Sequence, residues 1–261
     1  MRPVPRPTWD RERIVRSRVS IAIAVVVLLL AWVGIKTLTR DHIPDFSDYE
    51  NASEKKDAFF NYLAPYIAEV NAGILDQREH LLDIREDLDP GEQPGWFARR
   101  WIENALEEYE FDPVEEISDE TLRQLAQRMD IIPPSLVMAQ AANESAWGTS
   151  RFAQKGNNLF GMRTYEPGTG IVPKRRPAGQ TWEVAAYHSI GDSIEAYIHN
   201  LNTHDPYLRL RAIRADMRKK GQPITGTALA NGLRSYSELG YEYVSMIRSM
   251  IRSNDLERFD K

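Results

Sequence analysis

The chain has 261 residues, enough for one or two domains, and its 42% hydrophobic and 27% charged residues are ordinary for a globular protein. The net charge of −5 gives no support for nucleic-acid binding, and the absence of cysteine excludes disulfides, thiolate zinc sites and a cysteine nucleophile. The five histidines are scattered without a pair at metal-ligand spacing, so we expect no metal site.

The beginning of the chain has the pattern of a membrane anchor. Residues 1–18 carry six arginines, and residues 19–35 contain no charged side chain. As a helix, residues 19–35 reach about 25 Å, near the short end for crossing a bilayer. The alternatives are a cleavable signal peptide, whose apolar run is usually shorter, and a buried core helix. We predict a single-pass anchor with a cytoplasmic basic leader, which in a bacterium places the remaining chain in the periplasm.

Residues 36–53 are expected to form a polar linker, and a region of helical periodicity follows. The pattern predicts helices over 54–88, with a kink or a new start at Pro65, over 96–109, and after Ser118, which suits a helix N-cap. We expect the helices of 54–117 to pack as an extension on the domain that follows. The alternative for these helices is a module that binds a partner.

The most informative stretch is an apolar helix predicted between Pro134 and Gly148. Residues 137–142 are small or apolar except Gln140, a pattern typical of a buried helix. At helical spacing Glu144 shares a face with Gln140, and Trp147 follows three residues later. A carboxylate in this position is a candidate general acid. A single glutamate near a helix end is nevertheless more often a solvated surface residue.

The remaining chain predicts short elements around this helix. A helix capped by Thr149 or Ser150 ends at Gly156, and the turn residues of 162–187 indicate a small β-lobe with a strand over 181–187. Further helices are expected from Ser189 to about Pro206, and over 207–218, 229–234 and 241–252. The polar tail, residues 254–261, is expected to be frayed.

Two linked motifs bear on function. Residues 142–150 read Ala-Asn-Glu-Ser-Ala-Trp-Gly-Thr-Ser, and residues 157–161 read Asn-Asn-Leu-Phe-Gly. At this spacing they resemble the glucosaminidase family of peptidoglycan hydrolases (glycoside hydrolase family 73), and the similarity extends over 118–253, through Tyr187 and the segment around Tyr236. The helices from about residue 54 resemble those of the bacterial Bax-like proteins.

The resemblance implies a mainly α, lysozyme-like helical domain over 118–253, with a small β-lobe at 162–187. It implies hydrolysis of a β-1,4 bond after N-acetylglucosamine in peptidoglycan glycan strands, with Glu144 as general acid and no cofactor. The second catalytic group stays open among Glu166, Glu183, Tyr236 and the acetamido oxygen of the substrate itself, so a retaining or an inverting outcome is not predicted.

Aromatic and amide side chains of the same segments complete the predicted site. Trp147 and Phe160 are candidates for stacking on sugar rings, with core packing as the alternative for both, and Asn158 and Tyr187 are further candidate substrate contacts. Two other functions stay open. One is lytic transglycosylase cleavage, which leaves 1,6-anhydro ends, and the other is a non-catalytic peptidoglycan-binding scaffold. The sequence does not predict the oligomeric state.

Overall fold

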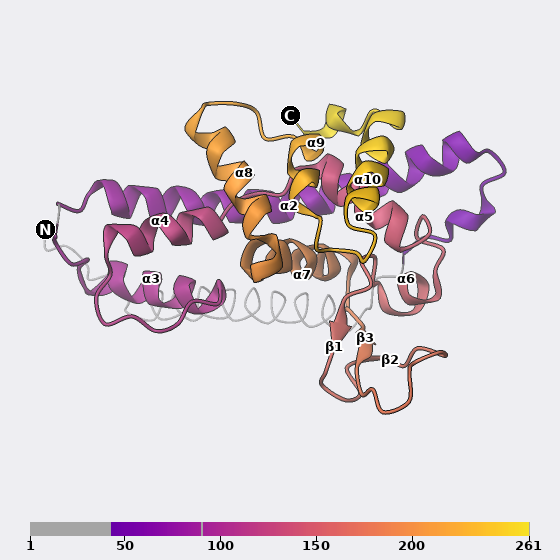
Figure 1. Ribbon diagram of the computed structural model, residues 1–261, viewed down its shortest axis with the longest axis horizontal. Coiled ribbons are helices and arrows are strands. Elements are labelled where there is room, and N and C mark those ends of the chain that lie inside the picture. The colour runs from indigo at the N-terminus through magenta and orange to yellow at the C-terminus, as the bar shows by residue number, and fades with distance from the viewer. Residues whose placement is uncertain (1–42, 90, 261) are drawn as a thin grey trace, which may run out of the picture. The chain divides into compact units, whose positions relative to one another are not determined.

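The computed structural model describes residues 43–89 and 91–260, so the predicted leader (1–18) and membrane anchor (19–35) lie outside the described residues. The described part is mainly helical with one small sheet, which confirms the predicted fold class at this level (Figure 1). No helix within these ranges is both long and apolar enough to span a bilayer.

The longest element is α2 (Ala52–Glu86), and it is followed by α3 (Trp96–Glu108), α4 (Asp119–Arg128), α5 (Pro134–Glu144) and α6 (Arg151–Gly156). After the strands come α7 (Ile190–Thr203), α8 (Leu208–Lys219), α9 (Gly226–Leu229) and α10 (Tyr241–Ser253). Short 3-10 turns are η1 (Phe46–Asp48), η2 (Asp205–Tyr207), η3 (Ala230–Gly232) and η4 (Leu256–Phe259).

The sheet forms the predicted β-lobe within residues 162–187. Strand β3 (Glu183–Ala185) lies between β1 (Arg163–Thr164) and β2 (Gly170–Ile171), and both pairings are antiparallel. Thr164 is opposite Glu183, and Gly170 is opposite Ala185. The lobe lies at one edge of the helices, below α7 in the view of Figure 1.

The helix starts are set by side-chain caps. Ser118 accepts a hydrogen bond from the main-chain N–H of Thr121, Ser150 accepts one from Ala153, and Ser189 forms a capping box with Asp192. The predicted starts at Ser118, Ser150 and Ser189 are therefore confirmed.

The predicted new start at Pro65 is wrong, because α2 runs through this residue without interruption. A proline inside a helix removes one main-chain hydrogen bond. On either side of it α2 buries large apolar side chains, among them Phe60, Leu63 and Ile67. Each such side chain stabilises the fold by about 1.5–3 kcal/mol, which is enough to offset the lost bond.

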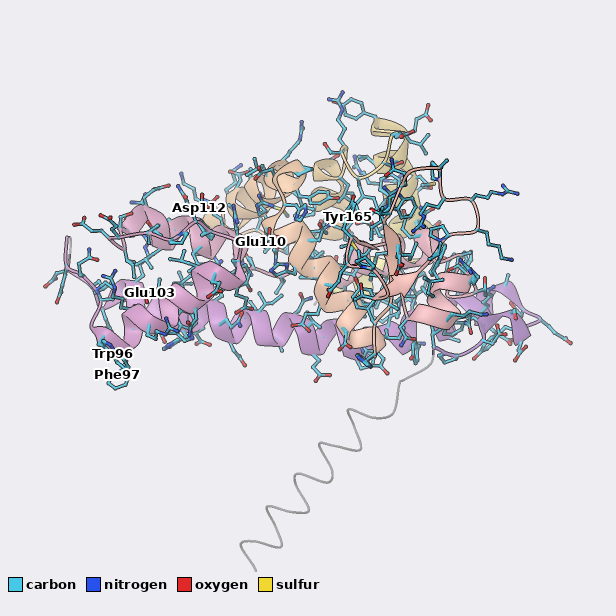
Figure 2. All side chains as sticks on the ribbon, turned by 90° about the horizontal axis from the view of Figure 1, so that it is seen from below. Trp96, Phe97, Glu103, Glu110, Asp112 and Tyr165 are labelled. Carbon is cyan, nitrogen blue, oxygen red and sulfur yellow. The ribbon has the colours of Figure 1, made fainter. Side chains whose placement is uncertain are left out.

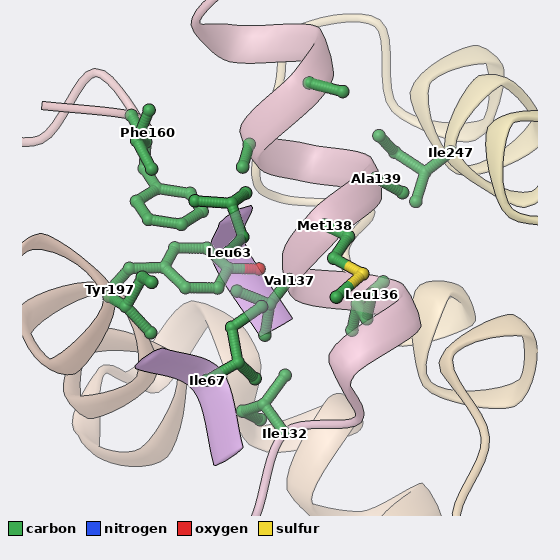
Figure 3. Close-up of a cluster of buried hydrophobic side chains, with 14 of the residues drawn as sticks. Leu63, Ile67, Ile132, Leu136, Val137, Met138, Ala139, Phe160, Tyr197 and Ile247 are labelled. Atoms are coloured by element: carbon green, nitrogen blue, oxygen red, sulfur yellow. The ribbon is translucent and has the colours of Figure 1, made fainter. Parts of the chain in front are cut away.

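Helix α5 lies at the centre of the larger core, as its apolar sequence predicts (Figure 3). Every side chain from Leu136 to Ala142 is buried, and Gln140 is the only polar one among them. The helix contacts α2, α9, α10 and η4. A second, smaller core joins the far end of α2 to α3 and α4 through Leu81, Ile102, Leu106 and Leu125.

The end of the chain is folded, so the prediction of a frayed tail is wrong. Leu256 is fully buried. The carboxylate of Asp260 accepts hydrogen bonds from the main-chain N–H of Ser135 (2.8 Å), the Ser135 hydroxyl (2.6 Å) and the N–H of Gly226 (3.1 Å). Helix α5 has Pro133 in the N-cap position, which makes no side-chain cap bond. Asp260 therefore supplies the missing acceptor from across the fold.

Candidate active site

Helix α5 ends at Glu144, four residues before the predicted stop at Gly148. The chain then takes positive φ angles at Ala146 (51°), Trp147 (60°) and Gly148 (76°), which no α-helix can continue through. Such angles are uncommon for residues other than glycine and store backbone strain. The turn leaves Glu144 half-buried at the end of a helix whose preceding turns are locked in the core.

One oxygen of Glu144 is held by two donors. Oε1 accepts a hydrogen bond from the Tyr243 hydroxyl (2.8 Å) and one from Asn143 Nδ2 (3.0 Å). Gln140 Nε2 donates to the Tyr243 hydroxyl (2.9 Å), and Gln140 Oε1 accepts from the hydroxyl of Tyr197. A chain of hydrogen bonds therefore runs from the core through Gln140 and Tyr243 to the carboxylate, and it fixes the orientation of Glu144.

A group of tyrosines surrounds this carboxylate. The ring of Tyr236 stacks on that of Tyr243, with centroids 5.3 Å apart and planes 12° apart, and its hydroxyl donates to the main-chain oxygen of Phe160 (3.1 Å). Burial raises the pKa of both phenols well above the usual range, and the neighbouring charge of Glu144 adds to the shift. Both hydroxyls therefore stay protonated and act as hydrogen-bond donors near neutral pH.

The main chain of Tyr187 is bound on both sides, because its N–H donates to the main-chain oxygen of Gly156 (2.8 Å) and its oxygen accepts from Asn157 Nδ2 (3.2 Å). Tyr187 is half-buried, and burial raises its pKa to about 12. Among the predicted site residues, the structure brings Glu144 and Tyr236 together, because Tyr243 donates to the first and stacks on the second.

The two residues predicted to stack on sugars occupy different surroundings. Phe160 is buried and stacks on Tyr197, with centroids 3.9 Å apart, so it belongs to the core. Trp147 is half-buried, and its ring packs edge-on against Phe59 (5.9 Å) and Phe60 (5.4 Å) of α2. Lys56 Nζ lies 5.4 Å from the centroid of the indole. Because α5 ends at Glu144, the helical spacing expected between Glu144 and Trp147 does not hold.

Asn158 ties the segment after α6 to the sheet. Its Nδ2 donates to the main-chain oxygens of Met162 (2.9 Å) and Ala185 (2.8 Å), and its Oδ1 accepts from the N–H groups of Phe160 and Met162. The neighbouring Asn157 takes a left-handed conformation and donates to the main-chain oxygen of Tyr187. The paired asparagines thus hold the lobe on the helices, and the four bonds of Asn158 occupy its whole amide.

The two candidate carboxylates of the lobe differ. Glu183 is largely buried on β3, and its carboxylate accepts hydrogen bonds from the N–H groups of Gly168 (3.2 and 3.3 Å) and Gly170 (3.0 Å). Glu166 is exposed in the turn that Glu183 binds, next to Tyr165, which is 72% exposed (Figure 2). Glu183 therefore fixes the turn between β1 and β2.

Sequence reasoning did not assign a site role to Gln140, Tyr243 or Asn143. Gln140 carried a signal, because it is the only polar side chain in the buried run Leu136–Ala142 and shares a face with Glu144. Tyr243 is distant in sequence, and only the packing of α10 on α5 brings it to the carboxylate. Within the described ranges, no group of three or more His, Asp or Glu side chains is arranged to hold a metal ion.

A carboxylic acid held in a fixed orientation at the end of a buried helix is suited to glycoside hydrolysis, which needs an acid next to the scissile bond. The sequence model of one family, described as mannosyl-glycoprotein endo-beta-N-acetylglucosaminidase, matches residues 119–256. Protein Bax of Escherichia coli (strain K12) is 33% identical over 212 residues, which are 81% of this chain and 74% of that protein. The chain therefore belongs to the glucosaminidase family and is a glycoside hydrolase, as its motifs predict.

Among solved structures, the chain is similar to the catalytic domain of the autolysin Auto from Listeria monocytogenes. The two are 16% identical, with a TM-score of 0.42 and coverage of 99% of each chain.

Proposed function

We propose that this protein hydrolyses the β-1,4 bond after N-acetylglucosamine in peptidoglycan glycan strands, with Glu144 as the general acid. The observation that carries the proposal is the fixed orientation of the Glu144 carboxylate by Tyr243 and Asn143. This carboxylate also lies within the segment that the glucosaminidase family model matches.

The chemistry follows from the oxygens of Glu144. Oε1 receives both hydrogen bonds, so Oε2 is the oxygen that carries the proton. As the bond between C1 and the glycosidic oxygen breaks, Glu144 protonates that oxygen and the leaving sugar departs with its hydroxyl. Positive charge then builds on C1 and the ring oxygen. The ionised Glu144 later takes a proton from the water that completes hydrolysis.

The group that attacks C1 is the second part of the proposal. The contacts of Glu183 favour the acetamido oxygen of the substrate, because the Glu183 carboxylate is bound to the N–H groups of Gly168 and Gly170. Attack by this oxygen forms a bicyclic oxazolinium, and water opens it to give retained configuration at C1. We place the reacting N-acetylglucosamine against Tyr236 and Tyr187, whose neutral hydroxyls can orient its acetamido group.

Digestion of purified peptidoglycan tests the reaction. Mass spectrometry of the released fragments should find N-acetylglucosamine at the reducing ends. Fragments ending in 1,6-anhydro-muramic acid would instead indicate a lytic transglycosylase, and binding without any release would indicate a scaffold protein.

We further propose that residues 19–35 anchor the protein in the inner membrane of a bacterium, with the catalytic domain in the periplasm. The uncharged run after six arginines supports this topology. A chain lacking residues 1–36 and given a cleavable export signal should appear in the soluble periplasmic fraction. Recovery of that chain as an integral membrane protein would contradict the single-span proposal.

A further inference from the structure

A cationic cavity of about 350 Å³ lies between α2, α4 and α8, away from Glu144. Asp130, which lines the cavity, precedes α5, whereas Glu144 is the last residue of α5. A helix about 16 Å long therefore separates the cavity from Glu144. One carboxylate, Asp130, lines it together with six cationic side chains: Arg78, Arg85, Arg123, Arg214, Arg218 and Lys219.

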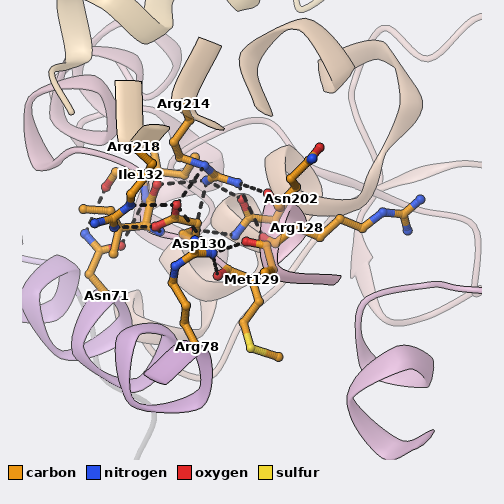
Figure 4. Close-up of polar contacts among 12 residues, drawn as sticks. Asn71, Arg78, Arg128, Met129, Asp130, Ile132, Asn202, Arg214 and Arg218 are labelled. Carbon is orange, nitrogen blue, oxygen red and sulfur yellow. Dashed lines mark hydrogen bonds and ion pairs between the residues drawn. The ribbon is translucent and has the colours of Figure 1, made fainter. Parts of the chain in front are cut away.

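The inner wall is a network around Asp130 (Figure 4). Arg218 binds both oxygens of this carboxylate, at 3.1 and 2.6 Å. Arg78 Nη1 lies 3.7 Å from it and donates to the main-chain oxygen of Met129 (3.0 Å). Arg214 is fully buried and lies 3.8 Å from the same carboxylate. Three guanidinium groups therefore share one buried carboxylate.

The positive charge is only partly compensated. At the rim, Asp119 pairs with Arg85 and Arg123, and Glu120 pairs with Arg123. Counting these, the cations still outnumber the carboxylates six to three. Carbonyl groups at the end of α4 accept bonds from Arg78 and Arg214 and offset part of the excess.

Burial and mutual repulsion both act on these guanidinium groups. Burial, together with the neighbouring guanidinium groups, lowers the pKa of Arg214 to about 10 and also lowers that of Arg78. Lys219 is exposed at the edge of the cavity, and its ammonium group has no ion-pair partner among the described residues. Arg218 is also 38% exposed at its side chain. An anion at this edge would meet available donors and relieve the repulsion among the arginines.

We propose that this cavity is a binding site for a phosphate group. Guanidinium groups bind phosphate oxygens in a bidentate geometry, and a dianion matches the excess of cations better than a single carboxylate does. The volume exceeds that of the phosphate alone, so a monoester with a small attached group fits as well. The same chemistry is offered by free inorganic phosphate and by a phospholipid headgroup.

Lys219→Glu tests the site, and Lys220→Glu is the matched control. Both lysines are exposed at the end of α8, but Lys219 lines the cavity whereas Lys220 pairs with Asp216. Neither contacts the core, so both variants should fold. Titration calorimetry of the full-length chain in non-ionic detergent should show binding of inorganic phosphate. Lys219→Glu should weaken it by about tenfold or more, with Lys220→Glu close to the wild type.

Acetate at matched ionic strength should not bind in the same experiment. Tighter binding of short-chain phosphatidic acid than of inorganic phosphate, with the same dependence on Lys219, would assign the site to a lipid headgroup; the reverse order would assign it to a soluble phosphate. The proposal is overturned if neither phosphate compound binds, if acetate binds equally well, or if Lys219→Glu and Lys220→Glu behave alike.

Discussion

The two residues that donate hydrogen bonds to Glu144 lie at very different distances from it along the chain. Asn143 is its neighbour in α5, whereas Tyr243 reaches it from α10 and is itself held by Gln140. A general acid must keep its proton directed at one oxygen of the substrate, and hydrogen bonds from rigidly held neighbouring side chains fix that direction. Tyr243 is therefore a positioning residue for Glu144 in the proposed mechanism.

Tyr243→Phe removes the hydroxyl that links Gln140 to Glu144. We expect kcat on peptidoglycan fragments to fall by about tenfold with little change in KM, because substrate contacts remain while the acid loses its orientation. The lost buried bonds should also lower the free energy of unfolding by about 1–3 kcal/mol. Tyr207→Phe is the control, since that hydroxyl bonds to Asn200 instead. Equal kcat for the two variants would contradict the positioning role.

Substitutions of Glu183 and Glu166 distinguish the groups that could attack C1 of the substrate. If Glu183 only holds the lobe, Glu183→Ala should lower activity and speed proteolysis of residues 165–180, because Gly168 and Gly170 lose their acceptor. Added azide should then yield no glycosyl azide. Glu166→Gln should retain nearly wild-type activity, since its side chain is exposed. Azide rescue of Glu183→Ala would assign Glu183 as the nucleophile and rule out the acetamido route.

At this scale the sequence predicted part of the site. The motif around Glu144 and the segment around Tyr236 pointed to residues that lie together. The sequence also suggested Asn158 as a substrate contact, but hydrogen bonds to the main chain occupy the whole amide of this side chain. A motif shows which residue types a segment carries, but whether an amide faces a ligand or the backbone depends on the fold around it.

Among the elements, the turn after α5 positions the site. Ser145 caps the helix after Glu144, and the next three residues have positive φ and redirect the chain. The third of them, Gly148, packs against Ile43, Phe46 and Phe59. Glycine is needed at position 148 for two reasons: the φ of 76°, and the lack of space for a Cβ atom.

Gly148→Ala should therefore destabilise the protein more than Gly161→Ala. Both glycines have positive φ, at 76° and 69°. A Cβ on Gly148 would lie 2.9 Å from Ile43, whereas one on Gly161 would meet nothing within 4 Å. We expect about 1–2 kcal/mol of backbone strain in each, and a further 1–3 kcal/mol from overpacking at Gly148 alone. Urea unfolding curves measure the difference, and equal losses would show that the turn has room to relax.

Local signals predicted helix starts better than helix ends. Serine caps act within three residues, so the sequence alone identified them. The end of α5 at Glu144 and the fold of the tail depend on distant contacts, such as the bonds of Asp260 to Ser135 and Gly226. No local pattern contains such contacts.

In the whole molecule, Asp130 binds side chains from three helices. Its carboxylate binds Arg78 of α2 and both Arg214 and Arg218 of α8, and its main-chain oxygen accepts from Asn202 of α7 (2.9 Å). Asp130 itself precedes α5, so the network couples the smaller core to the element that carries Glu144 (Figure 4). No local pattern indicates this network, because its members are spread over more than 130 residues.

Asp130→Asn should lower the free energy of unfolding by about 3–5 kcal/mol at neutral pH, because buried guanidinium groups lose their counter-charge. Burial acts to raise the pKa of Asp130, but the bond from Arg218 and the charges of Arg214 and Arg78 outweigh it and hold the pKa below its ordinary value. The carboxylate thus stabilises the fold above about pH 4, and this contribution disappears as the pH falls through the folded pKa. Unfolding curves between pH 7 and pH 2 should show the gap between wild type and variant narrowing. A constant gap would contradict this assignment.

The role of Glu144 as general acid is tested most directly by the rate at which Glu144→Gln cleaves peptidoglycan. The substitution keeps the size of the side chain and its acceptor oxygen, but it removes the acid. We expect an unchanged melting temperature and a loss of about 100-fold or more in kcat. A variant that folds as the wild type does and cleaves at a comparable rate would show that Glu144 is not the general acid.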